Sequence, residues 1–316
     1  MSKSKYIRPL GKKVIRFIGL VLLIHSILYF AYEFFGERNS KLFKNDLRLD
    51  THRSSIDFLF MGHSRPGHAI NDSLIPNAFN FASNGESNIY TYYKLKYLLE
   101  QTDKDINYIV FPIGHASFFD QKNPYIVNHN YWNKYIDYTE LGAAKSERFK
   151  YIQVNAQSTF TPYAHWINQV LNRKFPKLSH KKGGLHLLAN NEKKQAHAYT
   201  IIKNNLESRN YFSDISLSYF KRTIALCEKH NKKVILIRYP ITSYYKEASE
   251  TLISQQGLNH KGLNTILSSL EKVTIWDFEN LYFGRDELFK DAHHMNAAGR
   301  LEFSEFLKTR LENFTN

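Results

Sequence analysis

The chain has a single cysteine, Cys227, among its 316 residues. One cysteine cannot form an intrachain disulfide, and cysteine-based metal sites are excluded as well. Cys227 falls in a segment with helical periodicity, so we expect it to be a small buried apolar residue. The fold must therefore be held together by its core, without covalent cross-links.

Repeats, low-complexity segments and nucleic-acid-binding signatures are also lacking. The chain is 43% hydrophobic and 15% aromatic, which is enough to build a sizeable core, and its formal net charge is +14. A basic surface suits acidic glycopolymers or anionic lipid headgroups. Without an RNA- or DNA-binding motif, we expect no nucleic-acid partner.

Acidic side chains are absent from residues 1–16, which hold six basic ones. The mostly apolar residues 17–35 follow, and a helix of this length spans roughly 30 Å, about one hydrocarbon core. The preceding positive charge predicts a cytoplasmic N-terminus. A cleaved signal peptide is the alternative, but residues 31–35 match a cleavage site poorly. We expect a single-pass anchor, a polar stalk at 36–53 and an extracytoplasmic catalytic domain at 54–316.

Short apolar runs alternate with segments of helical periodicity. Strands are expected near 55–61, 76–82, 106–113, 233–239 and 273–278, and helices near 88–100, 215–230 and 297–313, with two more inside 243–270. This alternation predicts a parallel sheet with helices on both faces. The expected fold class is therefore α/β, a three-layer α/β/α flavodoxin-like fold.

Residues 118–212 do not follow this alternation, and we interpret them as an insertion at the carboxyl edge of the sheet. It would form a lid or a substrate-binding subdomain; a partly disordered loop is the alternative. Its basic cluster consists of Arg173, Lys174, Lys177, Lys181 and Lys182. Such a cluster could bind an acidic polymer or simply form a solvated face.

The first expected strand leads into Gly62-His63-Ser64. Gly62 allows a sharp turn, and Ser64 then lies at the carboxyl end of the strand, where open α/β sheets bind ligands. A serine at this place can act as a nucleophile if a base reaches it. Alternatively, Ser64 could cap the following helix.

Near the other end of the chain, Asp291 precedes His294 by three residues. One turn can bring this carboxylate onto the imidazole, which fixes the tautomer and leaves the other ring nitrogen free to act as a base. Asn296 is a plausible N-cap for the last helix. Asp291, His293 and His294 could instead ligate a metal, although residues this close together rarely supply a whole coordination shell.

The order of an early serine and a late acid-base pair narrows the choice of hydrolase fold. In α/β-hydrolases the nucleophile lies in Gly-x-Ser-x-Gly, and the acid is separate from the histidine. Here Ser64 is followed by Arg65-Pro66-Gly67, and Asp291 shares a loop with His294. Both features argue against the α/β-hydrolase fold.

With these motifs the chain resembles the SGNH (GDSL-like) hydrolase superfamily. Gly62-His63-Ser64 is similar to the first sequence block of that family, the segment Asn80–Gly85 to the second, and Asp291–His294 to the last. The third block normally supplies an asparagine to the oxyanion hole, but residues 111–117 contain none.

The resemblance implies acyl-ester chemistry through an acyl-serine intermediate. Ser64 would be the nucleophile, His294 the base and Asp291 the residue that orients it. The amides of Ser64 and Gly85 would form the oxyanion hole, with His115 or Ser117 in place of the missing asparagine. We expect no cofactor and no metal ion.

Membrane-anchored members of that superfamily act on envelope polymers. The resemblance therefore implies an O-acyltransferase or esterase acting on a cell-envelope polysaccharide, with a membrane-bound acyltransferase as a further expected partner that supplies acyl groups. The alternative is a non-catalytic protein that binds glycan or serves as a scaffold for such an acyltransferase. The missing asparagine favours this alternative, whereas the complete serine, aspartate and histidine set opposes it.

Overall fold

The structure is a computed structural model that describes residues 4–38, 41–52, 54–118, 134–136, 164, 166–168, 170, 191–208, 214–255, 266–270 and 272–315. Most of the expected insertion, including its basic cluster, lies outside the described residues.

Five parallel strands form one sheet. They are β1 (Ser55–Phe60), β2 (Ala78–Asn80), β3 (Asp105–Pro112), β4 (Lys233–Arg238) and β5 (Val273–Asp277). Their order is β2-β1-β3-β4-β5, and every neighbouring pair is parallel. This is the strand order of the doubly wound, flavodoxin-like arrangement. The expected fold class is confirmed.

The helices of the described part alternate with these strands. They are α1 (Ser4–Ala31), η1 (Tyr32–Glu37), α2 (Lys41–Thr51), α3 (Ser64–Ala69), η2 (Asp72–Leu74), α4 (Asn88–Gln101), η3 (His115–Phe118), α8 (Asn191–Ser208), α9 (Asp214–Lys229), α10 (Ser243–Gln255), η4 (Asp286–Leu288) and α12 (Ala297–Thr315).

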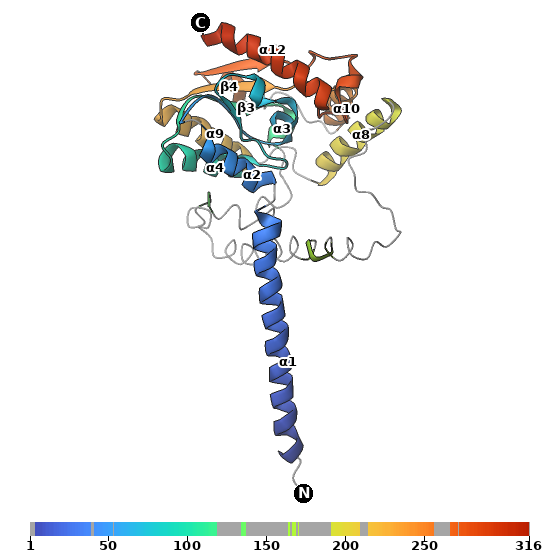
Figure 1. The fold of residues 1–316 in the computed structure, drawn as a ribbon. Coiled ribbons are helices and arrows are strands. Elements are labelled where there is room, and N and C mark those ends of the chain that lie inside the picture. The colour runs from blue at the N-terminus through green and yellow to red at the C-terminus, as the bar shows by residue number, and fades with distance from the viewer. Residues whose placement is uncertain are drawn as a thin grey trace.

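Both faces of the sheet are buried, which gives the three layers. Leu59 and Ile109 belong to a hydrophobic cluster that includes residues of α2, α4 and α9. Phe60 and Val110, their neighbours along the same strands, belong to a second cluster with α3 and α12 on the other face. A third cluster joins α8 to α10 and includes Ala292 in the loop before α12. Figure 1 shows these helices gathered around the sheet.

The segment from Gly11 to Phe35 forms a helix long and apolar enough to cross a membrane. It comprises most of α1 and the first part of η1, so it begins earlier than the expected anchor at 17–35. Most of its apolar side chains are exposed, among them Phe17 at 67% and Leu22 at 62%. In Figure 1, α1 extends away from the sheet, with the N-terminus at its far end.

The segment predicted to be a polar stalk contains α2, which packs against the sheet domain. Leu49 is buried in the cluster on that face. Arg48 forms an ion pair with Asp72 at 2.8 Å and donates a hydrogen bond to the carbonyl of Asn80 at 3.0 Å. The high charge of the segment conceals a helix with one apolar side, and the prediction from composition missed it.

Candidate active site

The turn after β1 places Ser64 at the carboxyl edge of the sheet. Gly62 has a φ of +102°, and a Cβ on it would lie 2.7 Å from Cδ of Pro112, so only glycine fits. His63 is the N-cap of α3: its Nδ1 accepts a hydrogen bond from the amide of Arg65 at 3.3 Å. The alternative in which Ser64 caps this helix is therefore wrong. Ser64 is the first residue of α3, and its hydroxyl is free for another contact.

The loop between η4 and α12 holds Asp291 and His294. Oδ1 of Asp291 accepts hydrogen bonds from the amides of His293 at 3.1 Å and His294 at 2.9 Å, so the carboxylate itself shapes the turn. Asn296 closes the loop because its side chain accepts a hydrogen bond from the amide of Gly299 at 3.0 Å. The expected N-cap of the last helix is confirmed.

Ser64, His294 and Asp291 form one continuous hydrogen-bonded chain. Nε2 of His294 lies 2.7 Å from Oγ of Ser64, and Nδ1 of the same ring lies 2.9 Å from Oδ2 of Asp291. A carboxylate only accepts hydrogen bonds, so Nδ1 carries the proton and Nε2 is free to accept one from the serine hydroxyl. The structure thus brings together three residues that the sequence separates by up to 230 positions.

Burial and neighbouring groups shift the pKa values of three side chains in and around this hydrogen-bonded chain. Burial alone would raise the pKa of Asp291, but the hydrogen bond and charge of His294 reverse that shift and hold the pKa below its usual range. Burial is the main cause that lowers the pKa of His63 to about 3, with smaller contributions from the neighbouring Arg65 and His294. Burial and the same two neighbours also lower the pKa of His293 well below its usual value. His63 and His293 are therefore neutral near pH 7.

His293 does not contact Ser64 in the way that His294 does. Its ring packs against His294 at 3.9 Å and against Tyr245 of α10 at 4.8 Å between centroids. Its Nδ1 is buried and has no hydrogen-bond partner. Donor atoms of Asp291, His293 and His294 lie within 4.8 Å of one another, which suits a metal ion, but no fourth His, Cys, Asp or Glu of the described residues joins the group. The carboxylate is also already occupied by two amides and a ring nitrogen.

The loop that carries Gly85 is tied to the turn that carries Ser64. The amide of Ser83 donates to the carbonyl of Gly62 at 2.9 Å. Behind the loop, the fully buried ammonium of Lys94 donates to the carbonyl of Phe81 at 2.6 Å. Gly85 itself has a φ of +73°, a conformation that favours glycine.

His115 and Ser117 are the expected replacements for the third-block asparagine, and the structure describes the side chain of Ser117 alone. His115 begins η3, but its side chain lies outside the described part of the structure. The carbonyl of Ser117, in the same helix, accepts a hydrogen bond from Asn88 at 3.0 Å.

Three further residues beside the hydrogen-bonded chain of Ser64, His294 and Asp291 were not predicted. Arg65 is only 7% exposed and its guanidinium lies 5.3 Å from the ring centroid of Tyr245. The ring of His68 packs 4.8 Å from that of His294, and Nζ of Lys290 lies 3.0 Å from Nε2 of His68. A helical spacing of four between Ser64 and His68 places both on one side of α3, and this signal could have identified His68.

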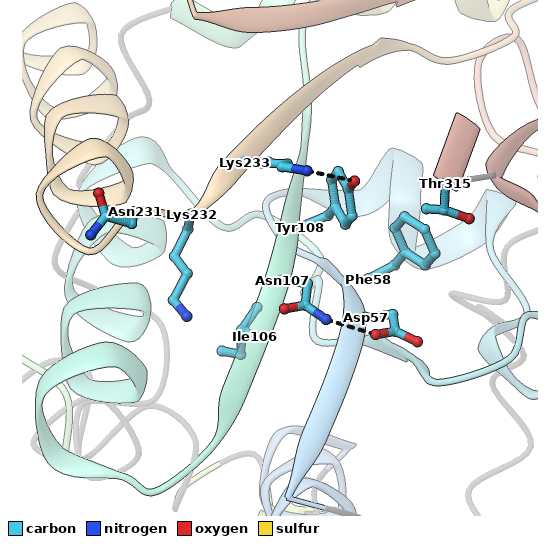
Figure 2. Close-up of a pocket in the computed structure, with 9 residues that line it drawn as sticks. All are labelled: Asp57, Phe58, Ile106, Asn107, Tyr108, Asn231, Lys232, Lys233 and Thr315. Atoms are coloured by element: carbon cyan, nitrogen blue, oxygen red, sulfur yellow. Dashed lines mark hydrogen bonds between the residues drawn. The ribbon is translucent and has the colours of Figure 1, made fainter.

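A separate pocket lies at the opposite, amino-terminal edge of the sheet. Figure 2 shows it between the early residues of β1 and β3 and the start of β4. Asn107 donates a hydrogen bond to Asp57 there, and Lys233 donates one to Tyr108. It contains no histidine and no member of the triad. The candidate chemistry lies at the carboxyl edge instead.

Comparisons with known proteins add little. A protein-family model that carries no functional description matches residues 179–316, less than half of the chain. No curated protein matches. A solved structure from Streptococcus pneumonia, provisionally described as a platelet activating factor, aligns over 95% of this chain and 99% of its own at 12% identity and a TM-score of 0.33. This similarity is too low to support an argument, so the function must be inferred from the geometry of the site.

Proposed function

We propose that the protein is a membrane-anchored serine hydrolase or O-acyltransferase of the SGNH type, acting outside the cytoplasm on acyl esters of a cell-envelope polysaccharide. The observation that carries this proposal is the hydrogen-bonded chain from Ser64 through His294 to Asp291. A serine hydroxyl 2.7 Å from a neutral, oriented ring nitrogen is the arrangement that activates a nucleophile.

The reaction has two halves. In the first, Oγ of Ser64 attacks the acyl carbonyl of the donor while Nε2 of His294 accepts the serine proton. The tetrahedral intermediate collapses, and His294 returns the proton to the departing alcohol. In the second, Nε2 removes a proton from the acceptor hydroxyl, which attacks the acyl-serine. The second tetrahedral intermediate collapses, the bond to Oγ breaks, and His294 returns the proton to Oγ of Ser64. Water as acceptor makes the protein an esterase; a sugar hydroxyl makes it an acyltransferase.

Asp291 and the backbone supply the electrostatic support. The carboxylate stabilises the imidazolium that forms when His294 takes the proton. The amides of Ser64 and Gly85 are the proposed donors to the oxyanion, since one begins α3 and the other lies in the adjacent loop. A missing oxyanion donor costs about 2.7–4 kcal/mol in the transition state, so a replacement for the third-block asparagine matters for the rate.

The location outside the cytoplasm rests on the charge pattern. A long apolar helix preceded by basic residues favours a cytoplasmic N-terminus and an external domain. In this proposal the ester belongs to an envelope polymer, and a membrane-bound acyltransferase supplies the acyl group where the protein works by transfer. A non-catalytic scaffold remains the second candidate, because residues 111–117 supply no asparagine to the oxyanion hole.

A fluorophosphonate probe separates the two candidates. We expect the full-length protein in detergent to be labelled, because an activated serine attacks such a probe. Ser64→Ala should abolish labelling without changing the melting temperature, since it removes one oxygen. Ser73→Ala, at an exposed serine beside β2, is the matched control and should label normally. A wild type that neither labels nor turns over activated esters would refute the enzyme and favour the scaffold.

A further inference from the structure

Arg65 is a buried charge directly after the proposed nucleophile. It is 7% exposed although it lies in the second position of a surface-edge helix. Its side chain crosses the end of β3: a Cβ on Gly114 would lie 3.1 Å from Nη1 of Arg65. The guanidinium then faces the ring of Tyr245 in α10 at 5.3 Å. The absence of a side chain at residue 114 leaves room for this path.

No carboxylate of the described residues forms an ion pair or hydrogen bond with this guanidinium. Asp291, the buried acid of the site, is occupied by two amides and by His294. Arg65 is more than nine-tenths buried as a residue, but none of its guanidinium nitrogens is among the fully buried, unpartnered side-chain atoms of the described residues, so the charged end still reaches solvent beside Ser64. A charged group with so little water around it gains from an anionic partner. The end of the Arg65 side chain is therefore open to an anion, and the described side chains supply none.

The surroundings of Arg65 favour an anion as that partner. His63 and His293 are both influenced by its charge, and both stay neutral near pH 7. The ammonium of Lys290 lies against His68, whose ring packs on that of His294. Asp291 is the one negative charge within the triad, and it is balanced by the imidazolium during the reaction. The charged groups described around the site are thus two cations, Arg65 and Lys290, and one carboxylate, Asp291.

We propose that Arg65, held against Tyr245, binds a carboxylate or phosphate group of the substrate next to the reacting ester. The proposal rests on the proposed function and specifies its substrate as anionic. A guanidinium presents a planar fork of donors that matches the two oxygens of such a group, and stacking on an aromatic ring fixes its plane. The developing oxyanion of the reaction is the competing use of Arg65, and kinetics can separate the two.

The first experiment measures binding without turnover. The full-length protein in detergent is titrated with inorganic phosphate by calorimetry. We expect binding by the wild type and by Ser64→Ala, and a loss of at least tenfold in affinity for Arg65→Gln. Arg285→Gln, at a solvent-exposed arginine in the turn before η4, is the matched control and should bind like the wild type. Equal phosphate affinity in folded Arg65→Gln and wild type would overturn the proposal.

If Arg65→Gln does not fold, Arg65→Lys takes its place. It keeps the charge but loses the fork, so we expect at least threefold weaker phosphate binding. Unchanged affinity would show that the guanidinium is not the binding group.

The second experiment compares two activated esters of equal acyl length, neutral 4-nitrophenyl butyrate and mono-4-nitrophenyl succinate, which carries a carboxylate. The ratio of kcat/KM for the succinate to kcat/KM for the butyrate should fall at least tenfold in Arg65→Gln. An equal loss on both esters would assign Arg65 to the oxyanion and overturn the subsite. A wild type inactive on both would refute the proposed function, while phosphate binding would still decide the anion site.

Discussion

Replacing Asp291 by asparagine tests the hydrogen-bonded chain at its far end. Asparagine can keep its side-chain oxygen at the place of Oδ1. That oxygen would still accept the hydrogen bonds from the amides of His293 and His294, whose nitrogens lie 3.1 and 2.9 Å from Oδ1 of Asp291. The turn should therefore survive. Its amide group would replace Oδ2, the carboxylate oxygen nearer to Nδ1 of His294 (2.9 Å, against 3.1 Å for the retained Oδ1), and would offer a donor where the carboxylate offered its closer acceptor.

The ring of His294 would then change its tautomer. With a donor facing Nδ1, that nitrogen becomes the acceptor and the proton moves to Nε2, which lies 2.7 Å from Oγ of Ser64. A protonated nitrogen cannot take the serine proton. In proteases with the same three groups this substitution lowers kcat about ten-thousandfold, which corresponds to about 5 kcal/mol of transition-state stabilisation. We expect a loss of the same order here, with a nearly unchanged melting temperature.

The assay is hydrolysis of an activated aryl ester by the full-length protein in detergent, with thermal unfolding as the control for folding. Asp57→Asn is the matched variant, because Asp57 accepts from Asn77 and Asn107 at the other edge of the sheet and should tolerate the change. Asp291→Ala should also be inactive and should melt earlier, since it loses the two amide contacts. Activity of Asp291→Asn within tenfold of the wild type would show that His294 does not depend on this carboxylate, and the mechanism would be wrong.

Three further outcomes are expected. His294→Ala should lower kcat by several orders of magnitude while His293→Ala costs far less, measured on one activated ester; the reverse order would favour the metal-site hypothesis. The pKa of His63 is about 3 in the folded protein, below its value in the unfolded chain. Between about pH 6.5 and 3 the unfolded chain therefore binds a proton at this residue that the folded chain does not. As the pH falls through this range, His63 lowers the free energy of unfolding by at most about 1.4 kcal/mol per pH unit. His63→Asn keeps a capping side chain and should move the midpoint of acid unfolding to lower pH; an unchanged midpoint would show that His63 does not titrate this way. With Cys227 buried, an impermeant thiol reagent on intact cells should label a cysteine placed at exposed Glu305 but not one at Lys5, and the opposite pattern would reverse the proposed topology.

The strands could be predicted closely from the sequence because each is a short apolar run that both faces of the sheet bury. The expected strand at 106–113, for example, is observed at Asp105–Pro112. The expected strand at 76–82 shrinks to Ala78–Asn80, because Asn77 adopts a φ of +51° that a strand does not accept. α2 was missed because its burial depends on partners distant in the sequence, above all Asp72.

In the candidate site, too, local contacts could be predicted from the sequence and distant ones could not. The contact between Asp291 and His294 could be predicted because it is local and follows from a spacing of three residues. Their meeting with Ser64 was expected only through the order of motifs, since a separation of 230 positions has no local signal. The cap formed by His63 was not predicted. Ser64 was considered as a cap only as the alternative to a nucleophile, because either side chain can accept a hydrogen bond from the first turn of a helix.

The strand order explains why these distant residues meet at one place. The connections from β1 and β3 leave the sheet in opposite directions, so the carboxyl ends of these two neighbouring strands border a crevice, the usual ligand site of doubly wound sheets. Ser64 follows β1 and Gly114 follows β3, and a Cβ on residue 114 would lie 3.1 Å from Nη1 of Arg65, so a side chain there would push the guanidinium from its present position. The position of Arg65 thus depends on a glycine 49 positions away, a dependence that the sequence cannot reveal until the strand order is known.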